Sequence, residues 1–276
     1  MAFLPLRRVP LPDDTAPRTE AWLADIARRL DDPACDRAEL CRDVLTDLWF
    51  PGLAGVDAET LPPGARIALE QLDPRNVTLE PEYYADVDPD RFARVKPLLW
   101  LWEMFDKSAA GENIHLGVRF RRILARHIFR RCGRNFKCFQ FVKFSFGYNM
   151  EVGDNVVVHR CVLLDDRGGI VMGNGSSVAD YANVYSHSHD LGDQRMVDSP
   201  VTVIGDGARV TYHATVLAGT RLEADSMLGA MALATKNIAS GEVAVGIPAQ
   251  PKLRKPPLEQ RPHNPRTVDP LADENP

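Results

Sequence analysis

Two histidines in one short segment give this chain its clearest capacity for proton transfer. The segment from Ser186 to Asp190 reads SHSHD. An imidazole titrates near pH ~6.5, so it can take a proton from a weak nucleophile such as an alcohol and return it to a leaving group. Most histidines in surface loops have no such role. The segment therefore predicts chemistry only if its surroundings support that role.

A six-residue repeat surrounds the histidine segment. Apolar residues recur every six positions, several are followed by Gly and then Asp or Asn, and small residues stand four places later. This period suits a chain wound as a triangular prism, with about 18 residues per coil and one apolar side chain per face in a narrow bore. The alternative is a β-sandwich, whose turns normally come every ~8–12 residues. The repeated apolar positions are Val152, Val158, Met172, Val178, Val184, Ile204, Val210, Val216, Leu222 and Leu228.

The repeat is interrupted once. Between Val184 and Ile204 the apolar positions are twenty residues apart instead of six. The histidine segment lies inside this interruption. We therefore expect both histidines in a loop that leaves the prism.

The N-terminal part of the chain has a different pattern. Between residues 13 and 132, apolar residues recur mostly at three- and four-residue spacings, with breaks near Asp32-Pro33 and over 51–64. These spacings predict amphipathic helices. The expected fold is mainly β, with a helical region at residues 1–144 followed by a parallel β-helix at 145–255. The Pro-rich tail at 256–276 is expected to be disordered.

Composition and charge exclude several classes of protein. The 276 residues are 45% hydrophobic and 26% charged, which is ordinary for a soluble globular chain, and the net charge of -5 argues against general nucleic-acid binding. No apolar run approaches the ~18 residues that span a bilayer, and the first residues lack the apolar core of a signal peptide. The five cysteines show no C-x-x-C spacing, which favours reduced thiols. These features predict a cytoplasmic protein.

The hexads, the interruption and the C-terminal segments resemble the hexapeptide-repeat acyltransferases, which are left-handed parallel β-helix enzymes. The resemblance covers roughly residues 145–255 and points to the maltose/galactoside O-acetyltransferase branch. It implies transfer of an acyl group, with acetyl as the first expectation, from acyl-CoA to a hydroxyl or amine of a small or glycan-linked acceptor. It also implies a homotrimer with sites between neighbouring prisms and no metal requirement. The matching C-terminal segments are Leu228–Ala230, Ala234–Ile238 and Val245–Ala249.

The same resemblance assigns roles to individual residues. His189 would be the catalytic base, whereas His187 would point elsewhere. The backbone amide of Tyr212 would stabilise the oxyanion, although Val210–His213 reads VTYH where the family usually has Ile-Gly-Ser-His. The coenzyme A residues would be Ala230, Thr235 and Lys236, with Lys252 and Arg254 at the phosphates.

The acceptor site departs from the family pattern. Asp165 and Asp166 match the acceptor-binding stretch, but Cys161 stands near the position of an asparagine that holds sugar hydroxyls in the family. The two aspartates also fit an ordinary turn. They are therefore candidate acceptor-binding residues, and a simple sugar acceptor does not follow from the sequence.

Two further interpretations stay open. Residues 113–150 carry nine basic and no acidic side chains. The helix expected at 116–131 could be a solvated basic face, an anion-attracting surface for coenzyme A or an acceptor, or a weak contact for a membrane surface. A rival function is a non-catalytic or carbonic-anhydrase-like β-helix, in which His159, His187, His189 and His213 would supply metal ligands from neighbouring subunits.

Overall fold

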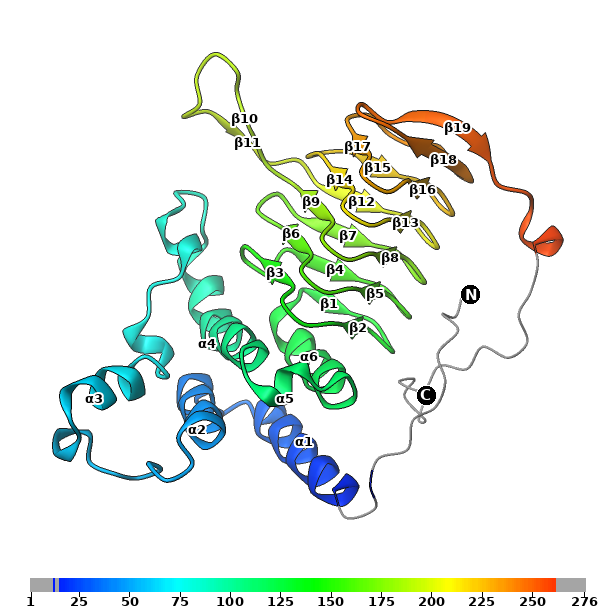
Figure 1. Ribbon diagram of the computed structural model, residues 1–276. Helices are drawn as coiled ribbons and strands as arrows, with labels where there is room; N and C mark the ends of the chain where they lie inside the picture. Colours follow the sequence, from blue (N-terminus) through cyan, green and yellow to red (C-terminus); the bar gives the residue numbers. More distant parts are fainter. Residues whose placement is uncertain (1–11, 13–14, 262–276) are drawn as a thin grey trace. The chain divides into compact units, whose positions relative to one another are not determined.

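A computed structural model describes residue 12 and residues 15–261, which divide into two compact units. One unit is helical and contains the described residues from Thr15 to Ile128, and the other contains Pro12 and the described residues from Phe129 onward. Figure 1 shows the helices of the first unit and the stacked short strands of the second. No helix among the described residues is long and apolar enough to cross a membrane.

The helical unit follows the apolar spacings of the sequence. The first two helices are separated near Asp32-Pro33, and the carboxylate of Asp36 caps the second by accepting the backbone N–H groups of Ala38 and Glu39. The α-helices are α1 (Ala16–Asp31), α2 (Arg37–Trp49), α3 (Pro63–Glu70), α4 (Pro89–Asp106), α5 (Ala109–Glu112) and α6 (Ile114–Ile128). The short 3₁₀ helices are η1 (Ala58–Thr60), η2 (Pro74–Asn76) and η3 (Glu80–Tyr83).

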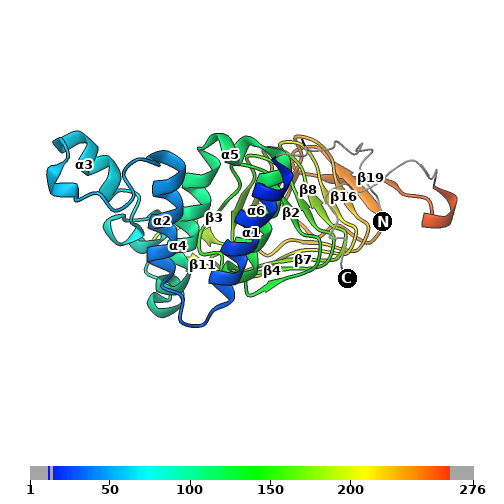
Figure 2. The same ribbon diagram turned by 90° about the horizontal axis from the view of Figure 1, so that it is seen from below.

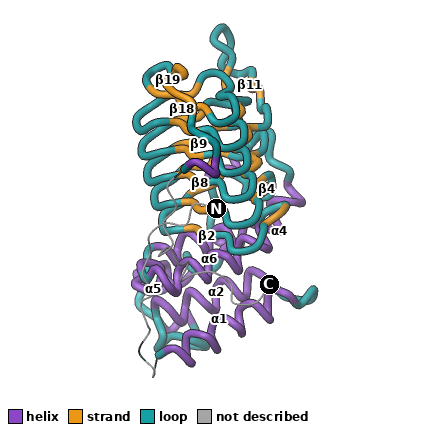
Figure 3. The backbone as a smooth tube through the Cα atoms, turned by 90° about the vertical axis from the view of Figure 1, so that its right-hand side faces the viewer, coloured by secondary structure: helices purple, strands orange, loops and turns teal. Residues whose placement is uncertain are grey.

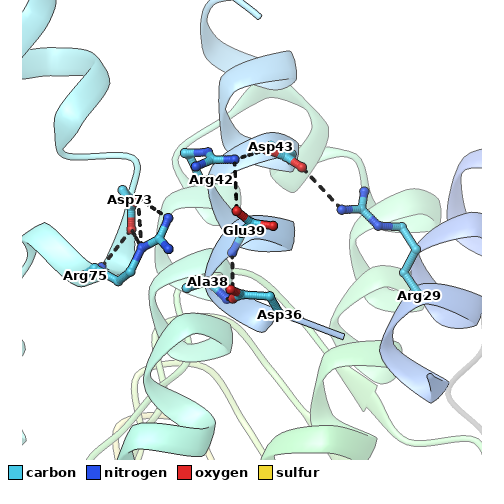
Figure 4. A network of polar contacts seen from close by, with 8 residues as sticks. All are labelled: Arg29, Asp36, Ala38, Glu39, Arg42, Asp43, Asp73 and Arg75. Carbon is cyan, nitrogen blue, oxygen red and sulfur yellow. Dashed lines mark hydrogen bonds and ion pairs between the residues drawn. The ribbon is translucent and has the colours of Figure 1, made fainter. Parts of the chain in front are cut away.

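Aromatic stacking and one buried ion pair form the centre of this unit. The ring of Phe120 stacks on Phe105 at 4.1 Å and on Trp22 at 5.2 Å between centroids. Beside them, the fully buried Arg121 donates from Nε to Asp106 at 2.7 Å. The surface pairs are weaker: Figure 4 shows Arg29, Arg42 and Asp43 linked across α1 and α2, where solvent screens the charges.

The basic segment does not form a continuous exposed face. Arg121 and Arg122 are buried, at 0% and 4% exposure, and Arg119 pairs with Glu20 of α1. Arg121 and Arg122 thus contribute to the interior of the helical unit and Arg119 to an ion pair, whereas Arg126 of the same helix is exposed. Arg126, Arg130 and Arg131 are exposed, so the basic surface over 116–131 is smaller than the sequence indicates, and the weak membrane contact stays a prediction.

The second unit is a parallel β-solenoid with three sheets along its length, which confirms the expected fold class. The coils stack as successive rungs, and Figures 2 and 3 show the short strands joined by corners. The first sheet contains β1 (Arg131–Cys132), β4 (Met150–Val152), β7 (Ile170–Met172), β12 (Thr202–Ile204) and β15 (Arg221–Leu222). The second contains β2 (Lys137–Cys138), β5 (Val157–Val158), β8 (Ser177–Val178), β13 (Arg209–Val210), β16 (Met227–Leu228), β18 (Glu242–Val245) and β19 (Gln250–Arg254). The third contains β3 (Lys143–Phe144), β6 (Leu163–Asp165), β9 (Asn183–Tyr185), β14 (Thr215–Val216) and β17 (Leu233–Ala234).

The coils are not uniformly 18 residues long. In the first sheet Arg131 pairs with Glu151, Glu151 with Val171, Val171 with Val203, and Val203 with Arg221, so the rungs are 20, 20, 32 and 18 residues apart. The extra residues lie at the corner between the third and first sheets. At this corner some backbone N–H groups have no partner in the next strand. The buried carboxylate of Asp166 accepts hydrogen bonds from two of them, the N–H groups of Phe146 and Asn149.

The repeated apolar residues fill the bore as the hexads predict. Every one of them is at most 1% exposed. The solenoid begins earlier than residue 145, because Cys132, Cys138 and Phe144 occupy the equivalent positions of a first coil. Cysteine and phenylalanine in place of aliphatic residues hide this coil from a search for aliphatic hexads.

The C-terminal end of the solenoid is closed by an antiparallel strand pair. Strand β19 runs against β18, and Lys255 and Arg261 both bind the carboxylate of Asp225. A short 3₁₀ helix, η4, spans Leu258–Gln260. The first residues of the expected tail are therefore held on the solenoid, and residues 262–276 of that tail lie outside the described residues.

Candidate functional site

The interruption of the repeat forms a loop at the corner between the third and first sheets. The chain leaves β9, forms the antiparallel hairpin β10 (Ser188–His189) and β11 (Val197–Asp198), and returns at β12. Figure 1 shows this hairpin projecting from the rungs. The two ends of the loop meet over Gly168, where a Cβ would lie 2.3 Å from the carbonyl oxygens of Ser186 and Ser199. Glycine is needed there because the backbones approach so closely.

His189 lies on this hairpin with an exposed side chain. Its Nδ1 lies 2.6 Å from the carbonyl oxygen of Gln194, so we assign the Nδ1 proton to this hydrogen bond. The other ring nitrogen, Nε2, then carries no proton, and its lone pair can accept one. This is the tautomer that a general base requires.

Asp190 supports His189 indirectly. Its carboxylate accepts the backbone N–H groups of Gly192 and Asp193 at 2.8 and 2.9 Å, and these bonds hold the pKa of Asp190 below its usual value. The resulting turn brings the Gln194 carbonyl to the imidazole. Asp190 therefore shapes the loop, whereas the backbone carbonyl of Gln194 fixes the tautomer.

Replacing Asp190 by Ala is expected to lower kcat about 3- to 10-fold, because the turn loses both side-chain hydrogen bonds. Asp190→Asn should restore most of the activity, since its amide oxygen accepts the same bonds. Steady-state kinetics of the two variants provide the check. The His189→Ala background is the control, and a further loss from Asp190→Ala in that background would show that Asp190 acts by another route.

His187 has a carboxylate partner of its own. Its Nδ1 contacts Oδ2 of Asp165, and the rings of His187 and His189 lie 5.5 Å apart at an interplanar angle of 83°. The Asp165 carboxylate also accepts a hydrogen bond from Ser145 Oγ at 2.8 Å. The expectation that His187 points elsewhere is wrong, because the structure places the two imidazoles side by side.

Asp166 is enclosed by the corner that it stabilises. It is fully buried, and burial raises its pKa to about 6 despite hydrogen bonds from the backbone amides of Phe146, Gly147 and Asn149. No surface of this carboxylate is available to an acceptor. Asp166 therefore has a structural position, unlike Asp165, which reaches His187.

The raised pKa of Asp166 predicts a pH dependence of stability. The pKa is near ~3.9 in the unfolded chain, so the folded chain retains the proton between about pH 4 and pH 6. The contribution of Asp166 to the free energy of unfolding should be greatest below that window and fall by up to about 3 kcal/mol as the pH rises through it. Urea unfolding at a series of pH values would measure the fall. Asp166→Asn should remove it, Asp198→Asn should keep it, and identical profiles for both variants would contradict the assignment.

Tyr212 lies at a different corner from the histidine loop. It follows β13 at the corner between the second and third sheets, and among the described residues nothing accepts its backbone N–H. The same corner holds the stacked rings of Tyr181 and His213, 5.0 Å apart, and Ala230 one coil later. A single chain therefore does not bring the Tyr212 amide to His189.

The remaining predicted ligand residues lie near the C-terminal end of the solenoid. Thr235 and Lys236 follow β17 and are exposed. Lys252 and Arg254 lie on the exposed strand β19, and Arg254 donates to the carbonyl oxygen of Ser240 at 3.0 Å. These positions leave their cationic groups accessible to a polyanion. No cluster of three or more potential metal ligands occurs among the described residues.

Comparison with known proteins places the chain among acetyltransferase-like sequences. No family model matches it. Over 167 residues it is 25% identical to galactoside O-acetyltransferase of Escherichia coli (strain K12), an alignment that covers 59% of this chain and 78% of the relative.

Two solved structures that resemble the solenoid are each 22% identical in sequence to this chain. Galactoside acetyltransferase in complex with coenzyme A matches with a TM-score of 0.55 over 66% of this chain and 89% of that one. Maltose O-acetyltransferase from Clostridium difficile 630 matches with a TM-score of 0.54 over 63% and 92%. The resemblance to the maltose and galactoside O-acetyltransferases is confirmed.

Proposed function

We propose that this chain is a coenzyme A-dependent acyltransferase in which His189 is the general base. The observation that carries the proposal is the orientation of His189 on the only long insertion among the described coils. The similarity to a galactoside O-acetyltransferase, and to a solved relative that holds coenzyme A, supports an acyl-CoA donor. The acceptor group is a hydroxyl or an amine.

The chemistry requires one proton carrier and one oxyanion donor. Nε2 of His189 takes a proton from the hydroxyl or amine of the acceptor while the acceptor oxygen or nitrogen forms a bond to the thioester carbonyl carbon. The carbon–sulfur bond then breaks, and the same imidazole returns the proton to the sulfur. The backbone N–H of Tyr212, which has no acceptor among the described residues, is suited to stabilise the negative oxygen in between.

Coenzyme A fits the residues at the Tyr212 corner and at the C-terminal end. Ala230 is exposed and small, which allows the pantetheine arm to approach the backbone. The exposed cations Lys236, Lys252 and Arg254 would bind the phosphates through charge-assisted hydrogen bonds. Thr235 lies beside Lys236 and would contact the same ligand.

The separation of these residues supports a trimer with shared sites. His189 and Tyr212 belong to different corners, so a complete site needs the loop of one chain and the Tyr212 corner of another. A closed ring of three chains would supply three such pairs.

Co-expression of two inactive variants tests this arrangement. His189→Ala removes the proposed base, and Ala230→Arg places a large side chain where the pantetheine arm is proposed to bind at the other corner. In randomly mixed trimers about a quarter of the sites combine an intact His189 with an intact Ala230, so activity should return to about that fraction. Light scattering should report trimers throughout. Monomers, or mixtures without recovered activity, would contradict the shared site.

The direct test of the proposed function is thiol release from acetyl-CoA by the full chain. Methyl β-galactoside, maltose and L-serine serve as the first acceptors, together with a reaction without acceptor. Acceptor-dependent thiol release supports the proposal. No release with any acyl-CoA, combined with about one zinc per subunit in metal analysis, would favour the carbonic-anhydrase-like alternative.

A further inference from the structure

A second imidazole lies beside His189 and is held by a nearly enclosed carboxylate. The side chain of His187 is 20% exposed and that of its partner Asp165 only 5%. A ligand at the loop can therefore reach His187 but not Asp165. This arrangement differs from the direct acceptor contact that the sequence predicts for Asp165.

Three successive coils fix the position of Asp165. Ser145 of the first coil donates to Oδ1 of Asp165 at 2.8 Å, and β6 pairs with β9 so that Asp165 lies opposite Tyr185. On the third coil, Ser186 donates to the backbone carbonyl of Asp165 from both its amide, at 3.0 Å, and its hydroxyl, at 2.6 Å. The carboxylate has little freedom to move, so it restrains the ring of His187.

The contact with Asp165 leaves one ring nitrogen of His187 for other interactions. Nδ1 is taken by the carboxylate, and no residue in the described part of the chain contacts Nε2. Nε2 can accept a hydrogen bond from a hydroxyl or amine, and it donates one when the ring carries a second proton. With the His189 ring centroid 5.5 Å away, both imidazoles can reach neighbouring groups of one small molecule.

We infer that His187 binds the acyl acceptor beside the group that His189 deprotonates, and that Asp165 is a positioning residue that acts through His187. The inference rests on the proposed function. It assigns His187 a part in acceptor binding and leaves proton transfer to His189. The ligand group that His187 takes is a second hydrogen-bonding oxygen or nitrogen of the acceptor.

Nuclear magnetic resonance tests the positioning of His187 without any acceptor. In the full chain labelled with ¹⁵N-histidine, two-bond ¹H–¹⁵N correlations should show the His187 proton on Nδ1. Asp165→Asn should change this signal, because an amide can present its N–H₂ group to the ring. Asp154→Asn, which alters a ladder aspartate at another corner, is the matched control. An unchanged His187 signal in Asp165→Asn would overturn the positioning role.

Kinetics with the acceptor that gives the greatest thiol release among methyl β-galactoside, maltose and L-serine test the binding role. His187→Ala and Asp165→Asn should each raise the acceptor KM about 10-fold or more, with the KM for acetyl-CoA unchanged and kcat nearly preserved. The double variant should be no worse than His187→Ala. His187→Gln, whose amide can occupy the position of Nε2, should recover part of the loss.

Several outcomes would overturn the binding role of His187 or the positioning role of Asp165. An unchanged acceptor KM would leave His187 with a structural role alone, and a loss confined to kcat would make it a proton carrier. Additive losses in the double variant would mean that Asp165 does not act through His187. Absence of thiol release from the wild-type chain would reject the proposed function and the acceptor role together, whereas the spectrum would still decide whether Asp165 positions His187.

Discussion

Replacing His189 by Ala is expected to lower kcat about 10²- to 10⁴-fold while the affinity for acetyl-CoA stays close to that of the wild-type chain. The imidazole is held by the Gln194 carbonyl at 2.6 Å, so its Nε2 is available for the acceptor proton. Its loss removes proton transfer from the transition state. Binding of the donor depends on other corners of the solenoid and should persist.

Steady-state kinetics at saturating acetyl-CoA, together with calorimetry of coenzyme A binding, separate these two effects. His115→Ala in the helical unit is the control, because that histidine is partly exposed, has one ring nitrogen in a hydrogen bond and lies outside the proposed site. A His189→Ala variant with wild-type kcat would place the base elsewhere. A variant with lost coenzyme A binding would mean that the loop contributes to the donor site.

Replacing Asp106 by Ala is expected to lower the free energy of unfolding of the helical unit by about 3–5 kcal/mol, the largest stability loss that we predict. Asp106 is 3% exposed and Arg121 is fully enclosed. The variant removes the Asp106 carboxylate from beside the guanidinium in the interior. The hydrogen bond from Arg121 to the Gly111 carbonyl, at 2.8 Å, remains but does not neutralise the charge.

Urea unfolding followed by the helical circular dichroism signal measures this loss. Asp25→Ala removes a solvent-exposed partner of Arg28 and should cost at most about 0.5 kcal/mol. The double variant Asp106→Leu/Arg121→Met removes both charges and should recover part of the stability. Equal stabilities of Asp106→Ala and Asp25→Ala would show that the buried pair contributes no more than a surface pair.

The sequence alone is sufficient to predict the β-helix and the position of its loop. A bore that admits one side chain per face requires an apolar residue at each sixth position, and this local requirement is visible without any long-range information. The interruption after Val184 marks the loop for the same reason. The helices are equally local, since the spacing of their apolar residues and breaks at Asp32-Pro33 depend on neighbours along the chain.

The first coil and the coil lengths depend on tertiary structure. Cys132, Cys138 and Phe144 fill the bore at one end, where packing accepts residues other than the usual aliphatic ones. The extra residues at one corner become possible because Asp166 satisfies the amides that leave the ladder. A strict six-residue repeat of aliphatic residues predicts neither the first coil nor the coils longer than 18 residues.

The environment of each charged side chain was also decided by the tertiary structure. The arginines of α6 form a basic run in the sequence, yet Arg121 is enclosed because Asp106, fifteen positions earlier, faces it across the helical interior. Asp165 and His187 are twenty-two positions apart and meet because successive coils stack in register. Sequence patterns report the chemistry of neighbours along the chain, whereas burial and pairing depend on which distant residues the fold brings into contact.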